Sequence, residues 1–122
     1  MSTLKSYRDL GVWAKSIDLV EQIYRASRVF PADERFGLTS QVRRAAVSVP
    51  SNIAEGAART TTGEFLQGLS VASGSLAEME TQVIIANRLD MLAVSEMDRL
   101  LAQSAEISKM LGGLKRSLES KR

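Results

Sequence analysis

The chain has 122 residues, of which 44% are hydrophobic, enough for one domain with a continuous core. It contains no cysteine and no histidine, which excludes disulfides, Cys/His zinc sites and catalytic triads that use histidine. The net charge of +2 comes from 16 basic and 14 acidic residues and is by itself a weak argument for nucleic-acid binding.

The first predicted helix covers about residues 8–29. Its apolar side chains recur at alternating spacings of three and four, which places them on one face. Phe30 precedes a proline and should leave the helical region, so Pro31 ends this helix. The predicted stripe consists of Leu10, Trp13, Ile17, Val20 and Tyr24, and it is widened by Val12, Leu19 and Ile23.

The second predicted helix covers about residues 33–58, either without a break or entered through a short turn at Phe36-Gly37, and contains Pro50. A proline inside a helix lacks the N–H donor and presses on the carbonyl four residues back, here that of Ala46, at a cost of about 3 kcal/mol. We therefore expect Pro50 to interrupt and kink this helix. The apolar face is formed by Leu38, Val42, Ala45, Val49, Ile53 and Gly56.

The third and fourth helices are predicted from about residues 61–62 and 95 onward. Thr61 or Thr62 can cap the third helix, and Ser95 with Asp98 resembles a capping box for the fourth. Because short links make neighbouring helices antiparallel, we predict an all-α, up-down-up-down four-helix bundle. It is expected to be a single domain over residues 1–122, with an ordered core at about 8–118. The core positions are Phe65, Leu69, Ala72, Leu76, Met79, Val83 and Ala86, then Met97, Leu100, Ser104, Ile107, Leu111, Leu114 and Leu118.

The N-terminal segment lacks the apolar run and cleavage site of a secretory signal. Apolar runs such as residues 83–86 are far shorter than the roughly 20 residues that span a bilayer. We expect a cytoplasmic protein, and we expect no cofactor.

Residues 40–56 read Ser-Gln-x-Arg-Arg-Ala-Ala-x-Ser-x-Pro-Ser-Asn-Ile-Ala-Glu-Gly. This segment, with Phe30-Pro31 and the Glu34-x-Phe36-Gly37-Leu38 run before it, resembles the four-helix-bundle proteins encoded in intervening sequences of large-subunit ribosomal RNA genes. The resemblance covers roughly residues 8–118. It implies assembly into a pentameric barrel, and a relationship to the accessory protein of the reverse transcriptase in diversity-generating retroelements.

Three arginines are candidates for contacts with nucleic acid or with another subunit: Arg43, Arg44 and Arg59. Adjacent helical residues diverge, so at least one of Arg43 and Arg44 should point outward. There a guanidinium suits a phosphate or a partner's carboxylate. The alternatives are a solvated charge, or a bridge within the chain to Glu55 or to the third helix.

Ser51, Asn52 and Glu55 follow Pro50 and form a second candidate group. Their side chains could satisfy backbone groups freed by the proline, or they could line a subunit interface. Gly68 and Gly74 lie inside the third helix, where glycine costs about 1 kcal/mol relative to alanine. We expect close packing there, either by the first helix of the same chain or by another subunit.

The sequence thus favours a non-catalytic, self-associating bundle. The resemblance implies that it is a pentameric scaffold or accessory protein, which would bind RNA, DNA or a reverse-transcriptase-like partner. One alternative is a module that binds only proteins through an exposed apolar stripe. The other is an enzyme that uses Glu55, Glu78 or Glu80, which would need a pocket where two of them converge.

Overall fold

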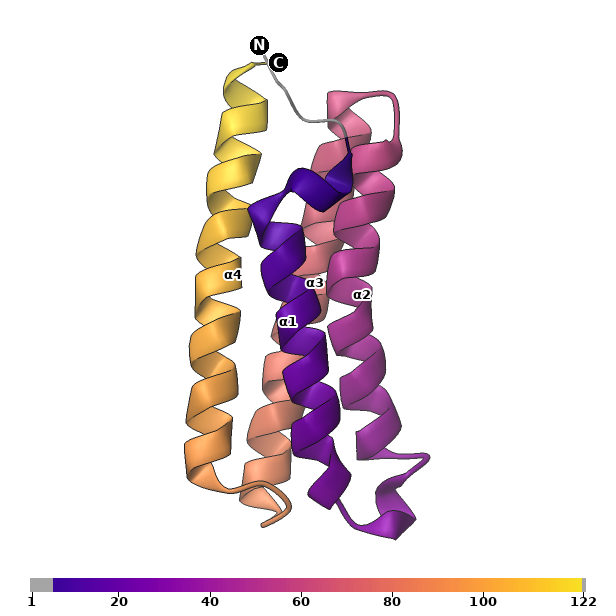
Figure 1. Cartoon of the computed structure of the whole chain (residues 1–122), viewed down its shortest axis with the longest axis vertical. Coiled ribbons are helices and arrows are strands. Elements are labelled where there is room, and N and C mark those ends of the chain that lie inside the picture. Colours follow the sequence, from indigo (N-terminus) through magenta and orange to yellow (C-terminus); the bar gives the residue numbers. More distant parts are fainter. Residues whose placement is uncertain (1–5, 122) are drawn as a thin grey trace.

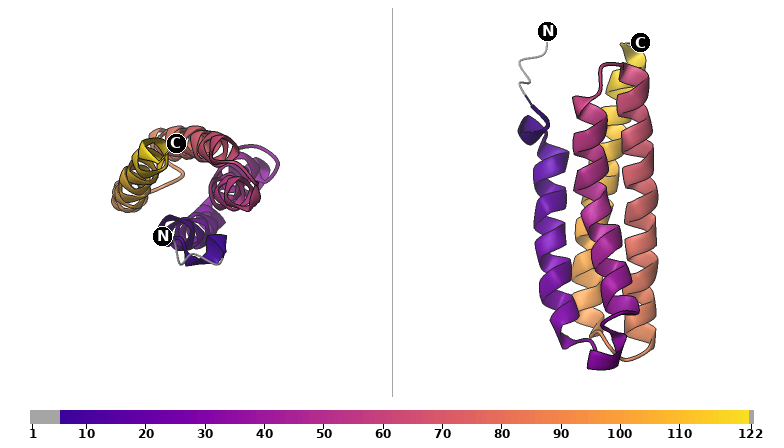
Figure 2. Two further views of the ribbon diagram at one scale, coloured as in Figure 1. Left: turned by 90° about the horizontal axis from the view of Figure 1, so that it is seen from above. Right: turned by 90° about the vertical axis from the view of Figure 1, so that its right-hand side faces the viewer.

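The computed structural model describes residues 6–121, which form four long helices and no strand. The helices are α1 (Gly11–Ala26), α2 (Leu38–Ala58), α3 (Thr62–Arg88) and α4 (Val94–Ser120). They lie side by side, each antiparallel to the one before it, and α1 contacts both α2 and α4 (Figures 1 and 2). The predicted all-α four-helix bundle is confirmed.

The first two helices are shorter than predicted, because 3-10 turns replace their outer ends. Tyr7–Asp9 and Ser27–Val29 flank α1, and Ala32–Glu34 precedes α2. The α2 helix begins at Leu38, not at residue 33, directly after a turn at Phe36-Gly37, which was one of the two expected entries. The Glu34 carboxylate accepts a hydrogen bond from the Leu38 N–H at 3.0 Å. The cap supplied by Glu34 satisfies an N–H that has no partner within the helix.

The predicted core face of α2 is buried at every position, from Leu38 to Gly56. The face of α1 is rotated from the prediction, since Ile17 is 37% and Tyr24 41% exposed. Val12, Leu19 and Ile23 were expected only to widen the stripe. These three residues are buried instead, together with Ser16. Because α1 packs against both α2 and α4, the face between these two neighbours becomes the core.

The core positions of α3 are confirmed from Leu69 to Ala86, while Phe65 is only partly buried. In α4, the middle of the predicted stripe, from Leu100 to Leu111, is buried and its two ends are partly exposed. Thr61 caps α3 as predicted by accepting a hydrogen bond from the Glu64 N–H at 3.1 Å. The predicted capping box of α4 is wrong, because α4 begins at Val94, after an N-cap residue that makes no side-chain hydrogen bond.

The α2 helix runs without interruption through Pro50, which is buried. The expected break is therefore absent, and the kink stays a prediction. The side chain of Ser51 donates to the Val47 carbonyl at 2.8 Å, and that of Asn52 donates to the Ser48 carbonyl at 2.8 Å. These side chains therefore bond to carbonyls of the turn beside Pro50. Neither of them bonds to the Ala46 carbonyl, which is the group that the proline was expected to free.

Over the part of the chain that the structure describes, no helix combines the length and apolar character needed to cross a membrane.

Candidate binding groove between α2 and α3

The outer side of the α2–α3 contact carries two shallow hollows, which we together call the α2–α3 groove. The hollow nearer the link between the two helices has a volume of about 320 Å³. The second lies closer to the start of α2. The first is lined by Asn52, Glu55, Gly56, Arg59, Glu64, Gln67, Gly68 and Val71, and the second by Gln41, Arg44, Ala45, Ser48 and Glu78.

Two glycines form the floor of the first hollow and bring the helix backbones together. A Cβ added at Gly68 would lie 2.7 Å from the Asn52 carbonyl oxygen and 2.9 Å from the Gly56 Cα. Both are main-chain atoms, which a side-chain rotation cannot move away. The close partner of Gly68 is therefore α2, whereas the sequence suggested α1 or another subunit.

Gly74 differs from Gly68, although both lie in α3. A Cβ added at Gly74 would meet no atom within 4 Å, and the residue is exposed. The close packing expected at Gly74 is absent among the described residues, because Gly74 itself points to solvent while its neighbours Ser73 and Ser75 bond to α4 and α2.

Between the two hollows, serine and asparagine side chains connect the helices. The hydroxyls of Ser48 and Ser75 lie 2.7 Å apart, and the Asn52 amide donates to the Ser48 hydroxyl at 2.9 Å. Asn52 is thus held by its own helix, with its remaining surface in the groove.

Among residues 6–121, the charged side chains of the groove other than Glu64, which accepts a hydrogen bond from the Thr61 hydroxyl at 2.9 Å, have no partners. Arg44, Arg59, Glu55 and Glu78 are exposed and form neither an ion pair nor a side-chain hydrogen bond there. The expected bridge from an arginine to Glu55 or to an acidic group of α3 is not formed. These charges remain available to an external partner, at a small desolvation cost because they are exposed.

Arg43 does not share this groove, because it faces α1. Its guanidinium donates from Nε to the Ser27 hydroxyl at 2.8 Å and from an outer nitrogen to the Tyr24 carbonyl at 3.3 Å. It also lies 4.6 Å from the centre of the Tyr24 ring. Arg43 thus ties the end of α1 to α2.

Ser51 and Pro50 lie on the α1 side of α2, in a hollow that the sequence did not single out. We call this hollow the α1–α2 apolar groove. The sequence signal for this groove was the predicted stripe of the first helix, which includes Trp13, Ile17 and Val20 and was assigned to the core. It is lined by Tyr7, Trp13, Ile17, Val20, Val47, Pro50, Ser51 and Ala54.

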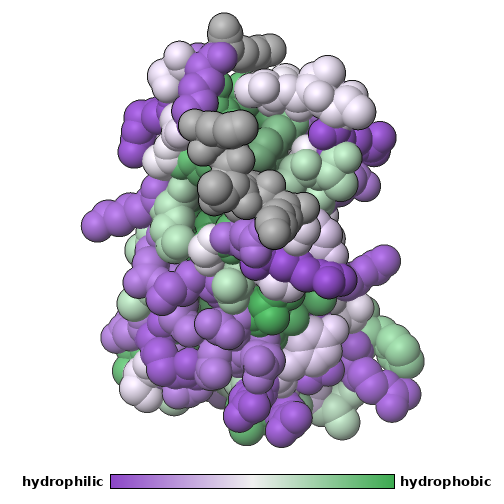
Figure 3. All heavy atoms as spheres, turned by 45° about the horizontal axis from the view of Figure 1, so that its top comes forward, coloured by the Kyte–Doolittle hydropathy of each residue, from purple (hydrophilic) through white to green (hydrophobic). Residues whose placement is uncertain are grey.

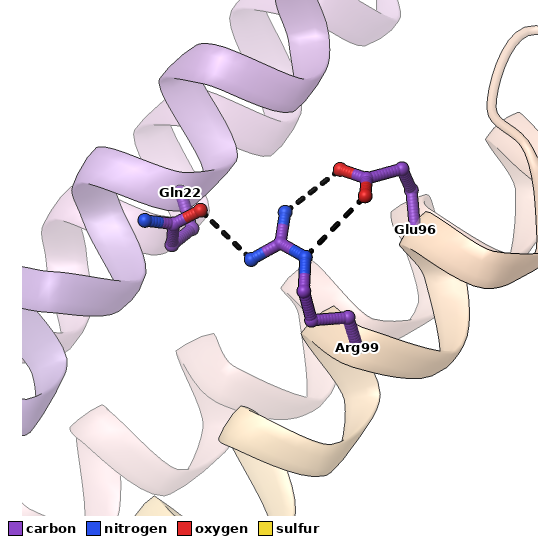
Figure 4. Close-up of polar contacts among 3 residues, drawn as sticks. All are labelled: Gln22, Glu96 and Arg99. Carbon is purple, nitrogen blue, oxygen red and sulfur yellow. Dashed lines mark hydrogen bonds and ion pairs between the residues drawn. The ribbon is translucent and has the colours of Figure 1, made fainter.

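Polar links join α1 to α4. Lys15 and Glu106 form an ion pair at 2.9 Å, and Arg99 donates to the Gln22 side-chain oxygen at 2.7 Å while also pairing with Glu96 (Figure 4). The hydrogen bond from Arg99, more than its charge, lowers the pKa of Glu96. Hydrophilic side chains cover most of the lower part of the face in Figure 3, with separate apolar ones between them.

The carboxylates considered for catalysis lie in different places. Glu55 and Glu78 line separate hollows, and Glu80 accepts a hydrogen bond from the Ser104 hydroxyl on α4. Among residues 6–121, no three acidic side chains gather so that they could hold a metal ion.

Comparison of the sequence with known proteins identifies the family of this chain. No curated protein matches the chain. The profile of the 23S rRNA-intervening sequence proteins matches residues 8–113, which span all four helices except the end of α4. The chain therefore belongs to the 23S rRNA-intervening sequence protein family.

Proposed function

We propose that the protein is a non-catalytic scaffold that self-associates, as a ring of five copies, and binds nucleic acid through arginines of the α2–α3 groove. The observation that carries the nucleic-acid part is that Arg44 and Arg59 are exposed and have no ion-pair partner among residues 6–121. A guanidinium without an internal partner can contact phosphate oxygens with two parallel hydrogen bonds.

Self-association is supported by apolar surface that one copy leaves open. The α1–α2 apolar groove is one such surface, and Ile84 and Ile85 on α3, each 40% exposed, are further apolar side chains open to solvent. Exposed apolar patches of this kind often mark interaction sites. Five copies of a chain with net charge +2 would carry +10, which strengthens the attraction for a polyanion.

The nucleic-acid proposal is tested with a duplex RNA and a duplex DNA of equal length, over a range of salt concentrations. Arg44→Ala combined with Arg59→Ala should weaken binding to both and lower the slope of log K against log salt by about 1 for each lost phosphate contact. Arg28→Ala combined with Arg88→Ala is the matched control. It removes the same two charges from exposed arginines that line none of the hollows described here.

No binding by the wild-type chain even at low salt would refute the nucleic-acid part. Equal losses in the double variant and in the two-arginine control would assign binding to net charge instead of to this groove.

A second candidate is an accessory module that binds only a protein, such as a reverse-transcriptase-like enzyme. The α1–α2 apolar groove favours it, since its lining is mostly apolar and includes Trp13 and Tyr7, residue types enriched at protein interfaces. Apolar docking is almost independent of salt, whereas phosphate binding weakens steeply. Ile17→Glu would impair only the apolar contact.

A further inference from the structure

Phe36 is the most exposed large apolar side chain of the described residues, at 85%. It lies in the link between α1 and α2, and the guanidinium of Arg35 covers its ring at 4.7 Å from the centroid. The link is held by hydrogen bonds, because the Gly37 and Leu38 N–H groups both bond to Glu34. The ring is therefore presented on an ordered turn, and aromatic and arginine side chains together are typical of interface anchors.

The same end of the bundle carries an apolar hollow, which we call the lower pocket. Its floor includes the buried Ala26 and Leu92, and its wall includes Val29, which is 72% exposed. The volume of about 360 Å³ is large enough to admit a phenyl ring. The complete lining is Arg25, Ala26, Val29, Leu92, Ala93 and Glu96.

The link and the pocket lie at the same level of the bundle but on different sides. In Figure 1 the α1–α2 link projects at the lower right, while the α3–α4 link, which contributes Leu92 and Ala93, closes the lower left. The chain cannot fill its own pocket with Phe36, whose ring remains exposed. A neighbour placed alongside with a parallel axis could do so.

The charges beside the two features are complementary. Arg35 lies next to the Phe36 ring and forms no ion pair among the described residues. Glu96 stands on the rim of the pocket and pairs there with Arg99 at 2.7 Å, but its side chain is still 42% exposed. Arg25, also on the rim, is paired with Glu21 at 3.2 Å. With the ring inserted, the Arg35 guanidinium would approach the exposed part of the Glu96 carboxylate, which favours the correct register between copies.

We propose that Phe36 of one copy inserts into the lower pocket of the next copy, with Arg35 beside the neighbour's Glu96. This inference rests on the proposed self-association and names the residues that carry it. The two surfaces differ, so the contact is heterologous, and repetition closes a ring when the rotation between copies is suitable.

Three variants test the contact by sedimentation velocity. Phe36→Glu removes the inserted ring, and Ala93→Trp, at an exposed position on the rim, fills the pocket. Each alone should weaken association by at least about tenfold, as expected for an interface anchor. Leu89→Glu is the control, because Leu89 is 61% exposed at the same end but does not line the pocket.

The decisive step mixes the two variants. The Phe36→Glu chain keeps its pocket and the Ala93→Trp chain keeps its ring, so the mixture should form a one-to-one dimer that grows no further. Wild-type assembly in Phe36→Glu, or a mixture that stays monomeric although both variants fold, would overturn the inference. A wild-type chain that never associates would instead refute the proposed self-association on which it rests.

Discussion

The α2–α3 contact and the α1–α4 contact are built in different ways. The first brings two backbones together at Gly56 and Gly68 with hydroxyl and amide bonds beside them. The second is bridged at its surface by an ion pair and by Arg99, with a hollow alongside Lys15 and Glu106. The comparison indicates that the α2–α3 pair supplies the rigid part of the bundle, whereas α1 and α4 complete it through weaker links.

The largest effect is expected from Gly68→Ala. Its methyl group would meet main-chain atoms of α2, so the helices must separate, and we expect a loss of about 1–3 kcal/mol in the free energy of unfolding. Gly74→Ala is the matched control in the same helix. Without a neighbour to contact, it should stabilise the protein by up to about 1 kcal/mol through helix propensity. Urea denaturation measures both, and equal effects would show that the backbones are not in close contact at Gly68.

Pro50→Ala should have a smaller effect on folding and a larger one on assembly. Alanine restores the N–H that bonds to the Ala46 carbonyl and should straighten α2. Because Pro50 lines the α1–α2 apolar groove, the distribution of oligomers should change more than the helical circular dichroism. Sedimentation with an unchanged distribution would remove the role proposed for this proline.

Breaking the polar links between α1 and α4 should change the melting temperature less than Gly68→Ala does. Lys15 and Glu106 are more than half exposed, and exposed ion pairs contribute little because solvent screens them. Lys15→Met is a suitable variant, followed by thermal melting. A fall as large as that of Gly68→Ala would contradict the contrast between the two contacts.

The smallest effect concerns pH. Arg99 lowers the pKa of Glu96 in the folded protein, so this pair favours folding above the pKa of an unfolded glutamate and loses that contribution as pH falls through the lower folded value. A carboxyl titration followed by NMR should give Glu96 a midpoint below that of an ordinary glutamate. Arg99→Gln should return it to the ordinary value, and an unchanged midpoint would mean that the bond does not persist in solution.

Helical periodicity predicted the four helices, the complete buried face of α2 and most of the core of α3, because each of these helices has one clear apolar face. It failed on α1, which carries two apolar stripes. Which stripe is buried depends on the helices that flank it. The sequence allowed the turn at Phe36-Gly37 as one of two entries to α2. It could not choose between them, because the side-chain cap from Glu34 and the 3-10 turns are decided by local geometry.

The candidate site was predicted only in part. Asn52, Glu55, Arg59 and Gly68 come together in one hollow, since their spacing on α2 and the short link to α3 place them on one side. Arg43 and Gly74 were grouped with them by residue type alone. Nothing in the local sequence indicates that Arg43 turns to Tyr24, or that Gly74 faces solvent.

We propose that this chain acts by assembling copies of itself. Native mass spectrometry of the wild-type protein over a wide range of concentration measures whether it does. A single closed species of five chains that persists on dilution is the predicted result. A particle with the mass of one chain at every concentration would contradict the account.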